Sequence, residues 1–142
     1  MLYIHCATRV NETHGLLIGG FQFFGTSYKT YYINLKTLDT SYGPELKTER
    51  RNLGCATADN RYVIVAGGHD GSNYLRSTEI LDLTKPNPSW TSGKKSNLEK
   101  AFICVFDLIL LLSGPDLPTK TYGLSMVESA NGILAIGGRD KN

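Results

Sequence analysis

Long hydrophobic runs and an excess of charge of one sign are both absent from this chain of 142 residues. The longest apolar run, Ala101 to Leu112, contains Asp107 and is shorter than the roughly 20 residues that a membrane-spanning helix needs. The 15 basic and 13 acidic residues are well mixed and leave a net charge of +2. Composition therefore indicates neither a nucleic-acid partner nor a membrane partner.

Cysteine is also scarce. The chain has three cysteines, Cys6, Cys55 and Cys104, with no CxxC pattern and no Cys/His cluster, so neither a zinc site nor a disulfide framework is indicated. We expect Cys6 and Cys55 to be small buried thiols. The first ten residues, MLYIHCATRV, lack the charged start and apolar stretch of a secretory signal. Together these features predict a cytoplasmic protein.

Catalytic and metal-binding patterns are missing as well. The histidines, His5, His14 and His69, show no metal-ligand spacing. The sequence has no nucleophile elbow, phosphate-binding loop or zincin helix. We therefore expect no catalytic residue, no cofactor and no metal site, and predict that the chain is not an enzyme.

What the chain does have is a strand pattern, clearest between Arg61 and Leu83. The apolar run Tyr62 to Ala66 ends at Gly67-Gly68, a polar loop follows, and a second β-rich run covers Thr78 to Leu83. A strand that is apolar at every position fits an environment covered on both faces. The glycine pair permits positive φ and a close backbone approach. This stretch predicts an antiparallel strand pair with a functional loop.

The same pattern recurs along the chain. Leu16 to Ile18 precedes Gly19-Gly20, and Gly19 lies 48 residues before Gly67. Ile133 to Ile136 likewise precedes Gly137-Gly138. Two further phrases are echoed: Gly43-Pro44-Glu45-Leu46 in Gly114-Pro115-Asp116-Leu117, and Leu53-Gly54-Cys55-Ala56 in Tyr122-Gly123-Leu124-Ser125. A period near fifty residues with double glycines resembles the kelch repeat, most closely that of the BTB-kelch proteins.

The resemblance implies an all-β fold of antiparallel four-stranded kelch blades, forming part of a β-propeller. It divides the chain into a first repeat over 1–52, a second over 53–121 and a partial third over 122–142. About two and a half repeats do not close a ring, so we expect a fragment, a truncated gene product or one part of a closed oligomer. Thr40 stands where the family has the tryptophan present as Trp90, which predicts a looser first blade. The incomplete third repeat would leave Ile133 to Gly137 as an exposed sheet edge unless another segment pairs with it.

The segment 94–114 interrupts the second repeat. The distance from Gly67 to Gly137 is 70 residues, and removing these 21 residues restores the period. A membrane span is excluded by length, but two interpretations stay open. One is a genuine loop insertion, which would expose an aggregation-prone apolar segment. The other is a retained intron translated in frame, a hypothesis that the nucleotide sequence tests.

The resemblance implies a non-enzymatic protein-binding module. BTB-kelch propellers recruit substrates to cullin-based ubiquitin ligases, so the leading expectation is the substrate-recruiting part of such an adaptor, with the cullin bound through a BTB domain that these residues do not contain. An actin-binding cytoskeletal kelch protein and a fragment of a kelch-fold enzyme are the alternatives.

In kelch proteins the loops after the double glycines and the links between blades lie on one face, which commonly holds partner peptides. Arginine with tyrosine and asparagine suits an acidic peptide, because guanidinium grips carboxylates while the rings supply rigid contact area. The residues that we expect on this face are Phe21, Tyr28, Arg50, Arg51, Asn52, His69, Asp70, Asn73, Tyr74, Arg76, Lys120 and Arg139.

Overall fold

The structure, a computed structural model, describes residues 4–93, 102–105, 116–117, 119–129 and 132–140. These residues form strands, turns and connecting segments, with no helix among them. The fold is therefore all-β, built mainly from antiparallel four-stranded sheets, which confirms the predicted fold class. Within the described ranges no helix has the length and apolar character to cross a bilayer.

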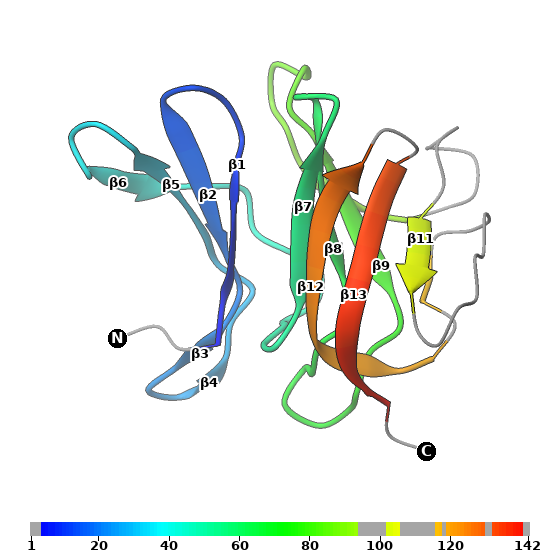
Figure 1. The fold of residues 1–142 in the computed structure, drawn as a ribbon. Coiled ribbons are helices and arrows are strands. Elements are labelled where there is room, and N and C mark those ends of the chain that lie inside the picture. Colours follow the sequence, from blue (N-terminus) through cyan, green and yellow to red (C-terminus); the bar gives the residue numbers. More distant parts are fainter. Residues whose placement is uncertain (1–3, 94–101, 106–115, 118, 130–131, 141–142) are drawn as a thin grey trace.

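Three sheets, which we call blades 1, 2 and 3, follow one another along the chain (Figure 1). Blade 1 has the order β1 (Cys6–Arg9), β2 (His14–Ile18), β5 (Thr30–Asn34) and β6 (Thr40–Tyr42). Blade 2 has the order β7 (Gly54–Ala58), β8 (Tyr62–Ala66), β9 (Thr78–Asp82) and β10 (Trp90–Ser92). Blade 3 contains β12 (Thr121–Ser129), β13 (Gly132–Asp140) and β11 (Phe102–Val105). A small hairpin of β3 (Phe21–Gln22) and β4 (Gly25–Thr26) follows β2.

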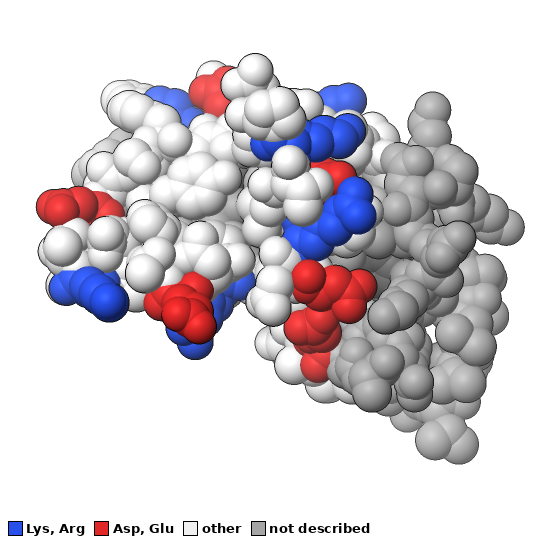
Figure 2. Space-filling view, turned by 90° about the horizontal axis from the view of Figure 1, so that it is seen from above, with Lys and Arg blue, Asp and Glu red and all other residues white. Residues whose placement is uncertain are grey.

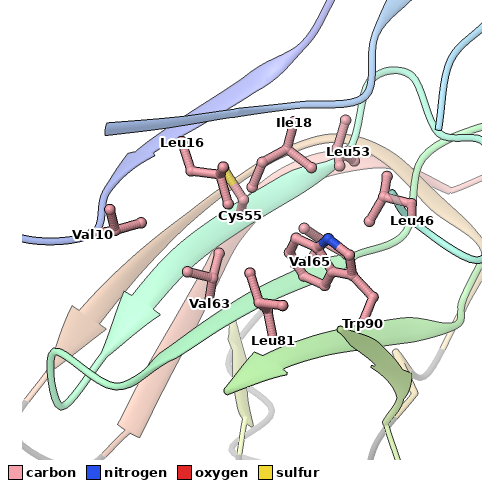
Figure 3. Packing of buried hydrophobic residues seen from close by; sticks show 10 residues of the cluster. All are labelled: Val10, Leu16, Ile18, Leu46, Leu53, Cys55, Val63, Val65, Leu81 and Trp90. Atoms are coloured by element: carbon pink, nitrogen blue, oxygen red, sulfur yellow. The ribbon is translucent and has the colours of Figure 1, made fainter. Parts of the chain in front are cut away.

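Blade 2 is covered on both faces, as the uniformly apolar β8 predicts. Val63 and Val65 belong to one buried cluster with residues of blade 1, and Ile64 and Ala66 to a second cluster with residues of blade 3. Figure 3 shows the first cluster, in which β2 side chains approach those of β7 and β8. Alternate residues of one strand thus bury against different neighbours, which is why β8 lacks polar positions.

Trp90 fills the same cluster from the outer strand of blade 2 (Figure 3). Its side chain is 2% exposed, and its indole N–H donates a hydrogen bond to the Pro44 carbonyl at 2.8 Å. Trp90 pairs with Leu81 on β9, and Thr40 pairs with Ile33 on β5. Ile33 lies 48 residues before Leu81 and is its counterpart in the first repeat. Thr40 therefore occupies the equivalent position, where its side chain is exposed and buries no comparable surface.

The double glycines are required where the link between two blades passes over the end of a strand. Gly19 and Gly67 both have φ of +62°, and a Cβ on either would lie 2.4 Å from a carbonyl oxygen, that of Arg50 or of Thr121. Gly20 and Gly68 donate their N–H groups to the same two carbonyls, at 2.7 and 2.8 Å. The glycine pair thus lets each link bond to the preceding blade, as the sequence predicts.

The expectation of two free buried thiols is wrong. Cys6 on β1 and Cys55 on β7 form a disulfide that joins blades 1 and 2, across a sequence separation of 49 residues. Cys6 and Cys55 occupy corresponding strands of successive repeats, and these strands lie side by side, which brings the two sulfur atoms within bonding distance.

The edge of blade 3 is paired by a segment of the chain itself. β11 runs parallel to β13, with Phe102 opposite Ile133 and Val105 opposite Ile136. The strands that correspond to β13 are β2 in blade 1 and β8 in blade 2. Each of them pairs at this edge with an antiparallel strand, β5 or β9. Residues 94–101 and 106–114 lie outside the described residues, so both interpretations of the 94–114 segment stay open.

Candidate functional site

The predicted binding loops lie at one end of the described chain. The β3–β4 hairpin, the loop between β8 and β9, and the start of β12 all lie at the lower end in Figure 1. The links after blades 1 and 2 reach this end because they bond to the double glycines. We call this end the loop face.

Arg51 is the centre of the loop face. Its backbone forms a bridge with His69, through an Arg51 N–H to His69 carbonyl bond of 3.0 Å and the reverse bond of 2.9 Å. The guanidinium carbon lies 5.1 Å from the centroid of the Phe21 ring, and Nη2 lies 3.5 Å from His69 Nδ1. The Gly71 N–H donates to the same Nδ1 at 2.9 Å, which in a neutral ring leaves the proton on Nε2. Arg51 is thus held between two rings from different blades.

Two tyrosines extend this arrangement toward blade 3. The Tyr74 ring meets the His69 ring edge-on, with centroids 4.6 Å apart, and the Tyr122 ring at 4.7 Å. All these side chains are half-buried. The residues Phe21, Arg51, His69, Tyr74 and Tyr122 therefore form one continuous series of contacts across all three blades, which we call the loop-face row.

Arg50 lies inside the protein instead. The residue is 1% exposed, and its guanidinium bonds to Glu79, to the Gly67 carbonyl and to Ser77. Burial lowers the pKa of Arg50, and the charge of Glu79 opposes that effect. We therefore leave Arg50 out of the proposed binding residues. Its partner Glu79 is the second residue of β9 and is 2% exposed.

Asp70 and Asn73 shape the loop between β8 and β9. Asp70 Oδ1 accepts hydrogen bonds from the Asn73 N–H at 2.6 Å and the Ser72 N–H at 2.8 Å. The Asn73 bond is the main reason why the pKa of Asp70 lies below its ordinary value. Asp70 therefore holds the loop's conformation as a carboxylate, while the Asn73 side chain stays exposed.

The other predicted residues surround the row without joining it. Tyr28, Arg76, Lys120 and Arg139 are exposed, and Arg76 Nε lies 3.8 Å from Asp116 Oδ2. Asn52 acts through its backbone, which accepts a hydrogen bond from the Gly123 N–H at 2.8 Å and donates one to the Ile4 carbonyl at 3.0 Å. The loop face therefore has a half-buried row with basic side chains around it.

Sequence reasoning missed Tyr122 because it aligned the second and third inner strands two residues out of register. The proposed echo matched Leu53 to Tyr122, but the structure makes Arg50 equivalent to Thr121, since their carbonyls accept the matching glycine bonds. Asn52 and Gly123 then correspond, and both have positive φ. In this corrected alignment Tyr122 is the counterpart of Arg51, and the repeat itself would have indicated it.

The opposite end of the molecule is different in character. Figure 2 looks onto that end, where the β1–β2 turn lies, and shows acidic and basic side chains interspersed over the described surface. A cleft of about 630 Å³ lies between the first strands of the three blades and extends to this end, with Arg9, Glu12, Asn60 and Glu128 in its lining. Its charged residues are of both signs, which matches the balanced composition and gives no single-sign field.

Among the described residues, no group of three or more histidine, cysteine or acidic side chains is arranged to hold a metal ion. No curated protein matches the chain. Residues 50–95, which run from the link through blade 2, match the family model described as Kelch motif. This match supports assignment of the chain to the kelch-repeat family.

Proposed function

We propose that this chain is a non-enzymatic protein-binding module whose loop face holds a peptide segment of a partner. Kelch repeats generally mediate interactions between proteins, which agrees with the match over residues 50–95. The observation that carries the proposal is the loop-face row, because it draws on the loops and links of all three blades.

The row favours a peptide that carries a carboxylate. Arg51 is positioned by its backbone bridge and by the Phe21 ring before any ligand arrives, so little side-chain entropy is lost on binding. Its guanidinium suits a carboxylate, and the neighbouring rings offer flat, rigid area for the flanking residues. Arg76, Lys120 and Arg139 add positive charge around the row.

A display library of short random peptides, panned against the purified chain, tests this proposal. We expect selected peptides to be enriched in Asp and Glu and to lose binding to Arg51→Ala and Tyr74→Ala. Arg61→Ala is the matched control, because Arg61 also lies over a ring, at 4.6 Å from the centroid of Tyr62, but belongs to the turn between β7 and β8. Peptides without acidic enrichment, or equal binding by Arg51→Ala and wild type, would overturn the proposal.

We propose further, from the resemblance to BTB-kelch proteins, that the bound peptide belongs to a substrate of a cullin-based ubiquitin ligase. Immunoprecipitation of the protein from its native cells, probed for cullin, tests this role. If no cullin is found in the precipitate, the ligase role is overturned and peptide binding remains the proposed function. The cytoplasmic location that such an adaptor needs stays a prediction. The Cys6–Cys55 disulfide removes one argument for it, because disulfides are rare in reducing compartments.

A further inference from the structure

The three blades pack against each other in one repeated way. Each blade has a front face toward the next blade and a back face toward the preceding one. Leu16 and Ile18, on the front of blade 1, share a buried cluster with Val63 and Val65 on the back of blade 2. The front of blade 2 and the back of blade 3 share the second cluster, through Ile64, Ala66, Ile80, Ile133 and Ala135.

The front face of blade 3 has the same apolar character but is uncovered among the described residues. Ile136 precedes its double glycine as Ile18 and Ala66 precede theirs, and both of those residues are 0% exposed. Ile136 is 46% exposed, and Val127, which lies opposite Leu134 on β12, is 48% exposed. Leu134, two residues before Ile136 and on the same face, is half-buried.

The back face of blade 1 is the second uncovered face. Leu17 and Ile33 lie 48 residues before Val65 and Leu81, which are both 0% exposed, yet Leu17 and Ile33 are only half-buried. The Tyr31 ring lies on this face, and the ring of Tyr42, which is 78% exposed, contacts it at 5.4 Å between centroids. Figure 1 shows no described segment beside blade 1 on the side away from blade 2.

We propose that a second copy of this chain covers both faces, with the front of blade 3 in one copy packed on the back of blade 1 in the other. One uncovered face is a front face and the other is a back face. A front face already packs on a back face between blades 1 and 2 and between blades 2 and 3, so the proposed contact would repeat this interface. A front face joined to a back face is a head-to-tail contact, which forms a closed ring when the rotation allows it. Two chains of three blades give a ring of six, within the range of about four to eight blades that propellers adopt.

The cleft between the first strands supports a ring. Residues of β1, β7 and β12 line the same hollow, which contacts all three blades and is open to solvent. In a closed pair the first strands of the second copy would face it, and the cleft would become half of a central channel. The disulfide between β1 and β7 fixes part of this wall.

Light scattering after gel filtration of the full chain tests the proposal. No reductant is added, so that the Cys6–Cys55 disulfide is kept, and no oxidant is added. We expect twice the chain mass of 15.6 kDa for the wild type. Ile136→Glu on the front face and Tyr42→Glu on the back face should each reduce the mass to that of one chain. Leu38→Glu is the matched control, because Leu38 is an apolar residue, 73% exposed, in the turn between β5 and β6 and outside the strands that form the two faces. This variant should stay a dimer.

Mixing the two variants tests the head-to-tail arrangement. The back face of Ile136→Glu and the front face of Tyr42→Glu are both intact, so the mixture should recover a two-chain species that neither variant forms alone. Val127→Glu repeats the front-face test, and circular dichroism establishes that each variant retains its sheet content.

A wild-type chain that stays monomeric up to about 100 μM, above the micromolar dissociation constants expected for a weak specific interface, would overturn the proposal. So would a dimer that survives both substitutions, or a mixture that stays monomeric. Polymers larger than two chains would overturn the closed ring.

Discussion

Glu79 gives the clearest example of how one side chain joins two blades. Its Oε2 accepts the Lys47 N–H at 2.8 Å, and its Oε1 accepts the Thr48 N–H at 3.0 Å and two guanidinium bonds from Arg50 at 3.2 Å. The carboxylate belongs to blade 2, and all its partners belong to the link that leaves blade 1. A charge buried to this extent is tolerated because four donors surround it.

We predict that Glu79→Gln destabilises the chain by about 3 to 5 kcal/mol, because it leaves the Arg50 charge buried without its counter-ion. The amide also replaces one acceptor oxygen with a donor that faces backbone N–H groups. Urea unfolding measures the change. Glu45→Gln, an exposed residue of the same segment, is the control and should change the stability by less than about 0.5 kcal/mol.

In a double-mutant cycle, Arg50→Met combined with Glu79→Gln should cost less than the sum of the single changes, since neither charge is then left alone. Additive costs would contradict the account of a coupled pair.

Asp82 makes stability depend on pH at the surface. The hydrogen bond from Arg61 is the main reason why the pKa of Asp82 lies well below its ordinary value of 3.8, and the hydrogen bond from Thr84 adds to the effect. A carboxylate with a lowered pKa in the folded state stabilises the fold above its unfolded pKa, and this contribution is lost as the pH falls below about 4. We predict that Asp82→Asn flattens the loss of unfolding free energy measured between pH 5 and pH 3. Parallel curves for the variant and the wild type would contradict this prediction.

The junction between a double glycine and the next link is the element that sets the spacing of the blades. At Gly19-Gly20 and Gly67-Gly68 the first glycine lies against a link carbonyl, and the second donates a hydrogen bond to it. Because this junction recurs at Gly19 and Gly67, the two blade contacts are built alike. The pair is thus a packing device, and no cofactor is needed to explain it.

We predict that Gly67→Ala destabilises the chain by more than about 2 kcal/mol, since it combines a positive φ with a Cβ against the Thr121 carbonyl. Gly15→Ala is the control, because its Cβ would meet its nearest atoms at an ordinary 3.5 Å. Thermal unfolding of both variants measures the difference. Equal melting temperatures would show that the link can move away without cost.

The sequence predicts those elements whose signals repeat. The strands around each double glycine, the paired faces of β8 and the buried Trp90 all follow from local patterns and a period near fifty. Contacts between different repeats follow less well, because they depend on how blades are placed side by side. The disulfide, the Arg50–Glu79 pair and the parallel strand β11 are of this kind. Phe21, Arg51, His69 and Tyr74 could be predicted because they lie in loops and links of the repeat. Tyr122 could be predicted only with the correct alignment of the second and third repeats.

At the scale of the whole molecule, several contacts attach blade 1 to blade 2. The two share a buried cluster, the Arg50–Glu79 pair crosses their boundary, and the disulfide joins their first strands. Blade 1 lacks the outer tryptophan of blade 2 and has an open back face, so it has less buried surface of its own. Its stability therefore depends on these attachments.

We predict that Cys6→Ser lowers the stability of the chain by about 4 kcal/mol, the loop-closure contribution for a cross-link of this span. Differential scanning calorimetry should show the same fall in melting temperature when the wild type is treated with a reductant. The variant itself should not respond to the reductant, which provides the control. A wild-type melting temperature that does not change on reduction would contradict the prediction.

The same disulfide changes how the protein would carry a mechanical load. Almost all of blade 1, from β2 to β6, lies in the loop that Cys6 and Cys55 close, so tension applied to the two ends of the chain passes through the sulfur atoms. The residues between the cysteines, which would span about 160 Å as an extended chain, would carry no tension while blades 2 and 3 unfold. In an oxidised protein under force, the blade that lacks the outer tryptophan is thus the one that is spared.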